Sequence, residues 1–173
     1  MSTSNGQNGT LMKQLQSHAQ AIAGKLKQRG HTLGTVESSA GGLIAASLLS
    51  VPGASAYFIG GAVVYTAQSR NALLDLPLVL PDGMRSATED YAALLADALQ
   101  RKLKTTWVLA ETGASGPSGN RYGDAAGHAC LAVRGPHGAT ITVETDDADR
   151  GRNMQAFAAA ALDLLDQMLD REA

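Results

Sequence analysis

Residues 58–76 read FIGGAVVYTAQSRNALLDL, a β-rich run that passes directly into a short helical segment. The first nine residues combine β-branched and aromatic side chains with two glycines, which is typical of a strand that closely approaches a neighbour. Residues 67–76 predict a short helix that Pro77 ends. A strand followed at once by a helix is the basic unit of an α/β fold.

The same alternation of strands and helices continues on both sides of this unit. Apolar periodicity and turn signals predict the other elements, which are helices over 11–29, 43–49, about 86–103 and about 152–170, and strands over 31–38, 105–111, 128–135 and 139–145. Gly30 follows the first helix as a C-terminal stop. Ser86 and Glu89 fit the capping box S-x-x-E in front of the third of these helices.

This order of elements predicts one α/β domain over residues 9–173, after a polar, flexible tail over residues 1–8. Strands that are separated by helices should run parallel, and the last two strands should form an antiparallel hairpin. We therefore expect a three-layer α/β/α sandwich with a mixed, mostly parallel five-stranded sheet.

Composition excludes several classes of function. Fourteen basic and 16 acidic residues give a net charge of -2, so we expect neither nucleic acid nor a membrane as a partner. The polar start is no signal peptide, and a single cysteine, Cys130, argues for a reducing compartment, so we expect a cytoplasmic protein. The four histidines share no metal-ligand spacing, and we expect no metal and no cofactor.

The first candidate site is the turn VESSAGGL at residues 36–43, where Ser38, Ser39, Gly41 and Gly42 lead from a strand into a helix. Backbone N–H groups at a glycine turn and the positive end of a helix favour a bound anion. The alternative interpretation is an ordinary helix cap.

The second candidate is the glycine-rich loop TGASGPSGNRYGD at residues 112–124, with Thr112, Gly113, Ser115 and Gly116. It contains neither a Walker A sequence nor the dinucleotide fingerprint GxGxxG. A loop of this length in a small domain favours a binding role, and the alternative is a long surface excursion.

The third candidate is a set of three side chains around the strand with which we began. Ser55 precedes that strand, Tyr65 ends it and Arg70 follows in the next helix. A set of this kind often serves only the packing of the fold. The sequence has no GxSxG elbow and no histidine beside a candidate serine, so a Ser-His-Asp triad is not expected.

Together these segments resemble the CinA C-terminal domain family, which includes nicotinamide mononucleotide deamidase. The family reads roughly AESCTGG, VPGSSAxFxGGxVxYSNxxK, TGxAGPxGG, xVGTVxxA and a late GDR. This chain reads VESSAGG, VPGASAYFIGGAVVYTAQSR, TGASGPSGN, AAGHACLA and DADRGR, in the same order and spacing from residue 9 to the end. The larger N-terminal domain of full-length CinA has no counterpart here, so its activity is not expected.

The resemblance implies an α/β/α fold, a homo-oligomer and hydrolysis of nicotinamide mononucleotide to nicotinic acid mononucleotide and ammonia. It implies a serine nucleophile with a lysine as its base. By position, the serine of PGSSA falls on Ser55, the motif tyrosine on Tyr65 and the GDR arginine on Arg150. The turn at residues 38–42 and the loop at residues 112–117 should then hold the nucleotide substrate.

The chain departs from the family pattern at the base, because Arg70 stands where the family has lysine. An arginine stays protonated and cannot take a proton from serine, which leaves Tyr65 as the candidate acceptor. Ala40 also replaces the threonine of CTGG, and Thr66-Ala67 replaces SN.

Two functional hypotheses follow from this departure. The first is a deamidase-like hydrolase in which Ser55 attacks the carboxamide, and Arg70 or Arg150 neutralises a phosphate or the intermediate. The second is a catalytically altered protein that binds a nucleotide or phosphometabolite without turnover. A structural subunit is a third possibility, and Ser38 remains an alternative nucleophile to Ser55.

Overall fold

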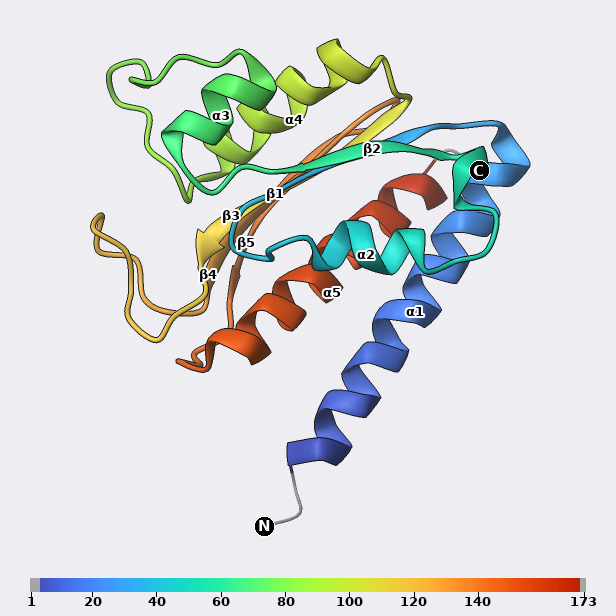
Figure 1. The fold of residues 1–173 in the computed structure, drawn as a ribbon, viewed down its shortest axis with the longest axis horizontal. Coiled ribbons are helices and arrows are strands. Elements are labelled where there is room, and N and C mark those ends of the chain that lie inside the picture. The colour runs from blue at the N-terminus through green and yellow to red at the C-terminus, as the bar shows by residue number, and fades with distance from the viewer. Residues whose placement is uncertain (1–3, 172–173) are drawn as a thin grey trace.

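The computed structural model describes residues 4–171, with side chains from residue 13 on. Figure 1 shows the arrangement of its elements. In chain order they are α1 (Ser4–Arg29), β1 (Leu33–Glu37), α2 (Leu43–Leu49), the 3-10 turn η1 (Ala54–Ala56), β2 (Phe58–Val63), α3 (Ala67–Leu74), α4 (Glu89–Leu103), β3 (Trp107–Ala114), β4 (His128–Arg134), β5 (Ala139–Glu144) and α5 (Arg150–Asp170).

The five strands form one sheet in the order β2-β1-β3-β4-β5. Strand β1 pairs in parallel with both β2 and β3, whereas β4 pairs antiparallel with both β3 and β5. Strand β5 therefore runs in the same direction as β1, β2 and β3, and only β4 is reversed. This confirms the mixed, mostly parallel sheet.

Helices cover both faces of the sheet (Figure 1). Helices α1, α2 and α5 pack together on one face, over strand residues such as Leu33 and Leu109, and α3 and α4 cover the other, over Val36 and Val108. The three-layer prediction is confirmed. The predicted apolar faces of the first and last helices are also buried, at Leu15, Ala19, Ile22, Leu26, Phe157, Ala161, Leu164, Leu165 and Met168.

Residues 4–8 of the predicted tail belong to helix α1, while residues 1–3 lie outside the described part of the chain. One local prediction is wrong. The N-cap of α4 is Thr88, whose hydroxyl accepts from the backbone N–H of Tyr91 at 3.2 Å, so Ser86 and Glu89 form no capping box. Glu89 instead accepts hydrogen bonds from Thr140 and Thr142 of β5.

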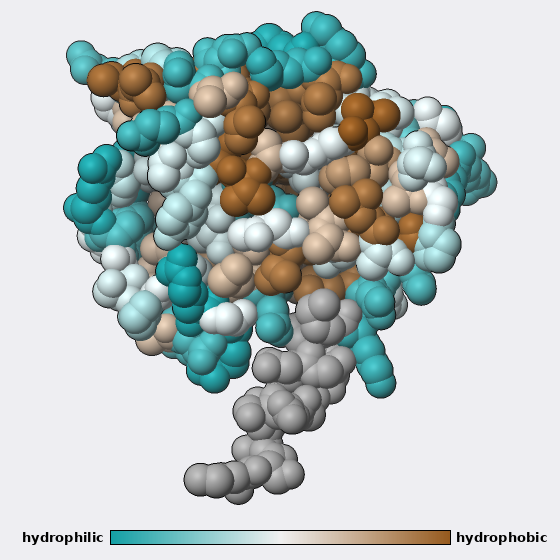
Figure 2. Space-filling model, in the orientation of Figure 1, coloured by the Kyte–Doolittle hydropathy of each residue, from teal (hydrophilic) through white to brown (hydrophobic). Residues whose placement is uncertain are grey.

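Apolar side chains are exposed along the β2 edge of the sheet and on the segments beside it. Ile59 and Val63 project from β2, and Leu78 and Val79 lie in the loop between α3 and α4. Figure 2 shows apolar residues gathered on this face within a polar rim. Within residues 4–171, no helix is long and apolar enough to span a membrane.

The carboxyl ends of β1, β2 and β3 lie at one end of the sheet, as the parallel pairing requires. The α3–α4 loop, the β3–β4 loop and the start of α5 also gather at this end (Figure 1). In open α/β sheets, ligands bind at the carboxyl ends of the strands.

Candidate functional site

A cavity of about 740 Å³ opens at this end of the sheet, within the size range of small-molecule sites. We call it the first cavity. Its wall includes Ser38 after β1, Tyr65 and Arg70 after β2, and Thr112 and Gly113 of β3. The structure therefore brings together residues from three strand ends that are far apart in the sequence.

Arg70 is only 5% exposed, and its guanidinium group contacts neutral groups. One terminal nitrogen donates to the carbonyl oxygens of Pro77 and Leu78 at 2.7 and 2.8 Å, and the other donates to the Tyr91 hydroxyl at 3.2 Å. The guanidinium carbon also lies 5.8 Å from the centre of the Tyr91 ring. Arg70 thus fastens the α3–α4 loop over the cavity, and it does not contact Tyr65.

Ser38 is half-buried in the wall of the same cavity. Its backbone N–H donates to Glu111 at 3.0 Å, and the N–H of Ala40 donates to the same carboxylate oxygen at 2.8 Å. The Ser39 hydroxyl donates to the other oxygen of Glu111. The side-chain oxygen of Ser38 makes no hydrogen bond to any described residue, so it is available to a ligand.

Two buried glutamates take the backbone donors of the Ser38–Gly42 turn. Glu37 accepts from the N–H groups of Gly42, Ile44 and Ala45, at 2.9, 3.1 and 2.8 Å, and so occupies the positive end of α2. Burial raises the pKa of both Glu37 and Glu111. The prediction that this turn binds an anion through its backbone is therefore wrong, because the protein supplies its own carboxylates.

A second cavity of about 230 Å³ adjoins the first and shares Tyr65, Gly113 and Asn120 with it. Arg150, the first residue of α5, donates to the carbonyl oxygen of Gly116 at 2.7 Å and to the Tyr65 hydroxyl at 3.0 Å. This arginine, and not Arg70, is the cation that contacts Tyr65.

The walls of the second cavity are largely the glycine-rich loop that was predicted to bind. Ser39, Ser115 and Gly116 line it together with Arg150. The side-chain oxygen of Ser115 is buried and has no hydrogen-bond partner among the described residues. Gly113 has a structural reason to be glycine, because a Cβ there would overlap the backbone of His128 and Ala129 on β4.

Ser55 lies in η1, before β2, and lines neither cavity. The full length of β2 separates it from Tyr65, which is about 20 Å at about 3.3 Å per residue. Figure 1 shows the segment before β2 at the opposite end of the sheet from α3. Within one chain, Ser55 therefore cannot act with Tyr65 and Arg70. Of the two candidate nucleophiles, Ser38 is the one that lines the first cavity with them.

The profile of the CinA C-terminal domain matches residues 15–169 of this chain. The chain belongs to the CinA C-terminal domain family. Two relatives, both called CinA-like protein, come from Parasynechococcus marenigrum and Myxococcus xanthus. Each is 35% identical, over 155 residues (88% of this chain) and 159 residues (89%) respectively, and the match covers 37% of each relative.

Crystal structures of CinA superfamily proteins share the fold of this CinA domain. The competence/damage inducible protein CihA from Agrobacterium tumefaciens superposes with a TM-score of 0.83 at 24% identity, covering 90% of this chain and 95% of that one. A superfamily protein from Klebsiella pneumoniae gives 0.84 at 20% identity, covering 91% and 98%.

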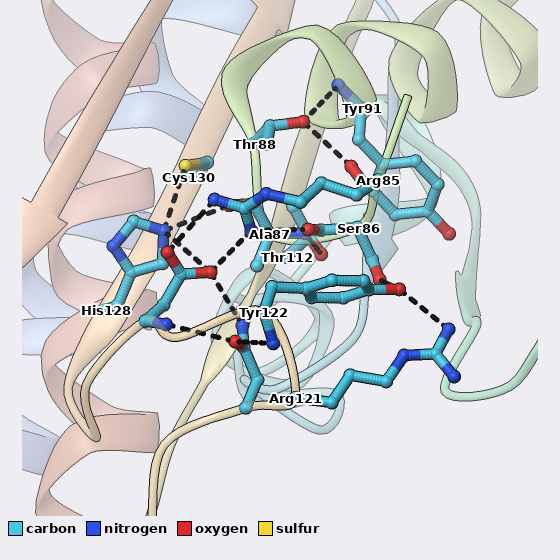
Figure 3. Close-up of polar contacts among 12 residues, drawn as sticks. Arg85, Ser86, Ala87, Thr88, Tyr91, Thr112, Arg121, Tyr122, His128 and Cys130 are labelled. Atoms are coloured by element: carbon cyan, nitrogen blue, oxygen red, sulfur yellow. Dashed lines mark hydrogen bonds and ion pairs between the residues drawn. The ribbon is translucent and has the colours of Figure 1, made fainter. Parts of the chain in front are cut away.

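Four charged or aromatic residues of the first cavity were not among the sequence candidates, namely Arg85, Tyr91, Arg121 and Tyr122. Figure 3 shows Tyr122 in the middle of a polar network that joins the β3–β4 loop to the segment before α4. The guanidinium carbons of Arg85 and Arg121 lie 5.2 and 4.9 Å from the centre of the Tyr122 ring. Arg85 also pairs with Asp124 through two hydrogen bonds of 2.5 and 3.0 Å.

His128 lies beside this network (Figure 3) and links three segments of the CinA domain. Its Nε2 lies 3.0 Å from the carbonyl oxygen of Ala87, and its Nδ1 lies 2.5 Å from Glu144. Asp124 is 4.0 Å from Nε2. Burial opposes the charged form of His128, but the hydrogen bonds to Glu144 and Ala87 outweigh burial and raise its pKa. Within the described residues, no three His, Cys, Asp or Glu side chains form a group that could bind a metal.

The raised pKa of His128 predicts how stability depends on pH. The imidazolium should stabilise the fold fully below the ordinary histidine pKa of about 6.5, and this stabilisation should be lost as the pH rises through the raised pKa of the folded state. The melting temperature of wild type should exceed that of His128→Gln at pH 6, and the difference should shrink at alkaline pH. His137→Gln, on the β4–β5 turn, controls for the loss of an imidazole. A difference that grows with pH would contradict the prediction.

Proposed function

We propose that this CinA domain binds a nicotinamide mononucleotide-like ligand in the two adjoining cavities and hydrolyses its carboxamide, with Ser38 as the attacking hydroxyl. The observation that carries the proposal is that Ser38 shares the first cavity with Tyr65 and Arg70, and that its side-chain oxygen accepts or donates no hydrogen bond among the described residues. The products would be nicotinic acid mononucleotide and ammonia.

The two cavities suit the two ends of such a ligand. The second cavity offers Arg150, the glycine-rich loop and the free hydroxyl of Ser115, which suit a phosphate group. The first cavity is larger and offers Ser38 together with apolar and aromatic walls from Val64 and Tyr91, which suit a ribose and a pyridine ring.

In the proposed reaction the Ser38 oxygen attacks the carboxamide carbon, and its proton passes to the departing nitrogen. The C–N bond then breaks, ammonia leaves and water hydrolyses the Ser38 ester to the free acid. Tyr65, whose hydroxyl accepts a hydrogen bond from Arg150, is the group of the cavity that we propose to relay the proton.

The second candidate function is binding without turnover, and the state of Arg70 favours it. Its guanidinium group is held by two carbonyl oxygens and cannot accept the Ser38 proton at any physiological pH. Wild-type turnover should therefore be slow compared with an enzyme that has a base at this position.

Ammonia release from nicotinamide mononucleotide distinguishes the two candidates. We expect slow release by wild type and none above the uncatalysed background by Ser38→Ala. Ser55→Ala is the matched control, because it removes a serine hydroxyl that lies outside both cavities, and its rate should equal that of wild type.

Three outcomes would change the assignment. Loss of activity in Ser55→Ala would place the reactive hydroxyl on η1, against the geometry of the single chain. Equal rates for wild type and Ser38→Ala would exclude Ser38 as the nucleophile. Ligand binding without any ammonia release would establish the second candidate.

A further inference from the structure

We propose that the first cavity selects a ligand with a carboxylate group over the same ligand with a carboxamide, and that Arg70 is the specificity-determining residue. The inference rests on the proposed function, because it takes the pyridine end of the ligand to lie in the first cavity. It identifies the preferred ligand as the acid form, nicotinic acid mononucleotide, and not the amide.

The wall of the first cavity carries positive charge. Three arginines, Arg70, Arg85 and Arg121, line the first cavity, and none of its described lining residues is acidic. Arg85 is neutralised by the two hydrogen bonds with Asp124, and Arg121 is exposed, so water screens its charge. Arg70 is the arginine that is both buried and without an acidic partner among the described residues.

The positive charge of the buried Arg70 is only partly compensated. A buried charge costs free energy unless an opposite charge or hydrogen bonds compensate it. The partners of Arg70 are two carbonyl oxygens and a phenol, which satisfy some donors but leave its positive charge in place. An anion in the cavity would supply the missing charge, whereas a neutral carboxamide would not.

Arg70 has N–H groups that donate to no described residue. A guanidinium group has five N–H bonds, and Arg70 uses three of them, on Pro77, Leu78 and Tyr91. Its Nε is buried and has no partner among the described residues, and one terminal N–H is also unused. An oxygen of a carboxylate can accept from the unused terminal N–H and also brings the negative charge that Arg70 lacks, whereas a carboxamide brings no charge.

The two adjoining cavities set the length of the ligand. The second cavity holds an independent anion anchor, because Ser115 is 2% exposed with an unpartnered hydroxyl and Arg150 stands in the same wall. The two cavities meet at Tyr65, Gly113 and Asn120, so one ligand can reach both. A ligand with a phosphate at one end and a carboxylate at the other satisfies both anchors.

Calorimetric titration of wild type with the two mononucleotides tests the inference without any variant. We expect nicotinic acid mononucleotide to bind at least about tenfold more tightly than nicotinamide mononucleotide, equivalent to about 1.4 kcal/mol. Equal binding, or tighter binding of the amide, overturns the inference. Failure of both nucleotides to bind overturns it together with the proposed function.

Two further ligands separate the sources of anion binding. Nicotinate alone should compete with the full acid nucleotide, and inorganic phosphate should compete with both nucleotides equally. If phosphate lowers the apparent affinity of the acid nucleotide more than that of the amide, Arg70 holds phosphate, and the carboxylate assignment is wrong.

Variants assign the preference to Arg70. Arg70→Gln should bring the acid-to-amide affinity ratio close to one. Arg70→Lys, titrated at about pH 6, where the protonated ammonium group keeps the charge with fewer donors, should give an intermediate ratio. Arg101→Gln is the matched control, since it removes an exposed arginine of α4 that lines neither cavity, and it should change the ratio by less than about twofold. A ratio unchanged in folded Arg70→Gln would overturn the assignment.

This test is independent of catalysis. A strong preference for the acid with no ammonia release would support the inference while refuting the hydrolase. Ammonia release with equal affinity for acid and amide would support the hydrolase while refuting the inference.

Discussion

Replacing Glu111 by alanine should lower the free energy of unfolding by about 3–5 kcal/mol, because it leaves buried donors without an acceptor. The backbone N–H groups of Ser38 and Ala40 and the hydroxyl of Ser39 all donate to this carboxylate, in a region that water does not reach. Each buried donor that loses its partner costs about 1–3 kcal/mol. Denaturant unfolding would measure the loss as a lower midpoint with an unchanged slope.

Glu111→Gln is the matched control for this prediction. Burial raises the pKa of Glu111, so a neutral amide of the same shape is a close substitute. One amide oxygen can accept both backbone N–H groups, and its NH₂ can donate to the Ser39 hydroxyl. We expect a loss of about 1 kcal/mol or less. A loss as large as that of Glu111→Ala would show that the negative charge itself, and not the hydrogen bonds, stabilises the turn.

The effect on stability has a functional counterpart. Glu111 on β3 fixes the segment that carries Ser38 after β1, so the same contacts that stabilise the domain also place the candidate nucleophile at the cavity. Ligand affinity in Glu111→Gln should therefore remain close to that of wild type, provided that the turn keeps its shape.

The fold could be predicted from local sequence because its elements carry strong periodic signals. Apolar residues at helical spacing predicted the buried faces of α1 and α5. The strands β4 and β5 flank a turn that Pro136 indicated in the sequence. The N-cap of α4 was misplaced because both Ser86 and Thr88 can cap a helix. In the folded chain Ser86 instead bonds to Tyr122, and Glu89 accepts from Thr140 and Thr142, which are 51 and 53 residues away.

The sequence predicted most of the candidate residues that line the two cavities, but not which of them lie together. Nine of the 12 candidate residues line one of the two cavities, whereas Ser55, Gly41 and Gly42 do not. Ser55 was favoured because it falls on the serine of the family motif PGSSA, but Ser55 and Tyr65 lie at the two ends of one strand and therefore at opposite ends of the sheet. The glycine turn was misread because nothing in a local sequence shows that Glu37 and the distant Glu111 would take its N–H groups.

Two of the residues that were not predicted owe their place to contacts that are distant in sequence. Arg85 lies in the α3–α4 loop and Tyr91 at the start of α4, and only the folded chain brings them against Tyr122 and Arg70 respectively. Their sequence signals were those of an ordinary helix start. Arg121 and Tyr122 did lie inside the loop that was predicted to bind, so attention to aromatic and basic residues in that loop would have found them.

Arg70→Lys should raise the rate of ammonia release from nicotinamide mononucleotide by on the order of 10²–10⁴, the usual contribution of a general base. A lysine in this buried position would lose its proton more readily than in water, because burial disfavours the charged ammonium form. The neutral amine could then take the proton of Ser38 in the same cavity, which a guanidinium group cannot do. Single-turnover assays at about pH 8, where more of the lysine is neutral, would measure the gain.

Two controls separate base chemistry from a general change of the cavity. Arg70→Gln removes the arginine charge without adding a base and should show no gain, and the double variant Ser38→Ala with Arg70→Lys should return to the uncatalysed background. Each variant also loses contacts to Pro77 and Leu78, so its melting temperature must be compared with that of wild type. A wild type already as fast as Arg70→Lys would mean that another group takes the proton. Tyr65, which contacts Arg150, would then be the residue to replace next, because its phenol is the remaining acid–base group that adjoins both cavities.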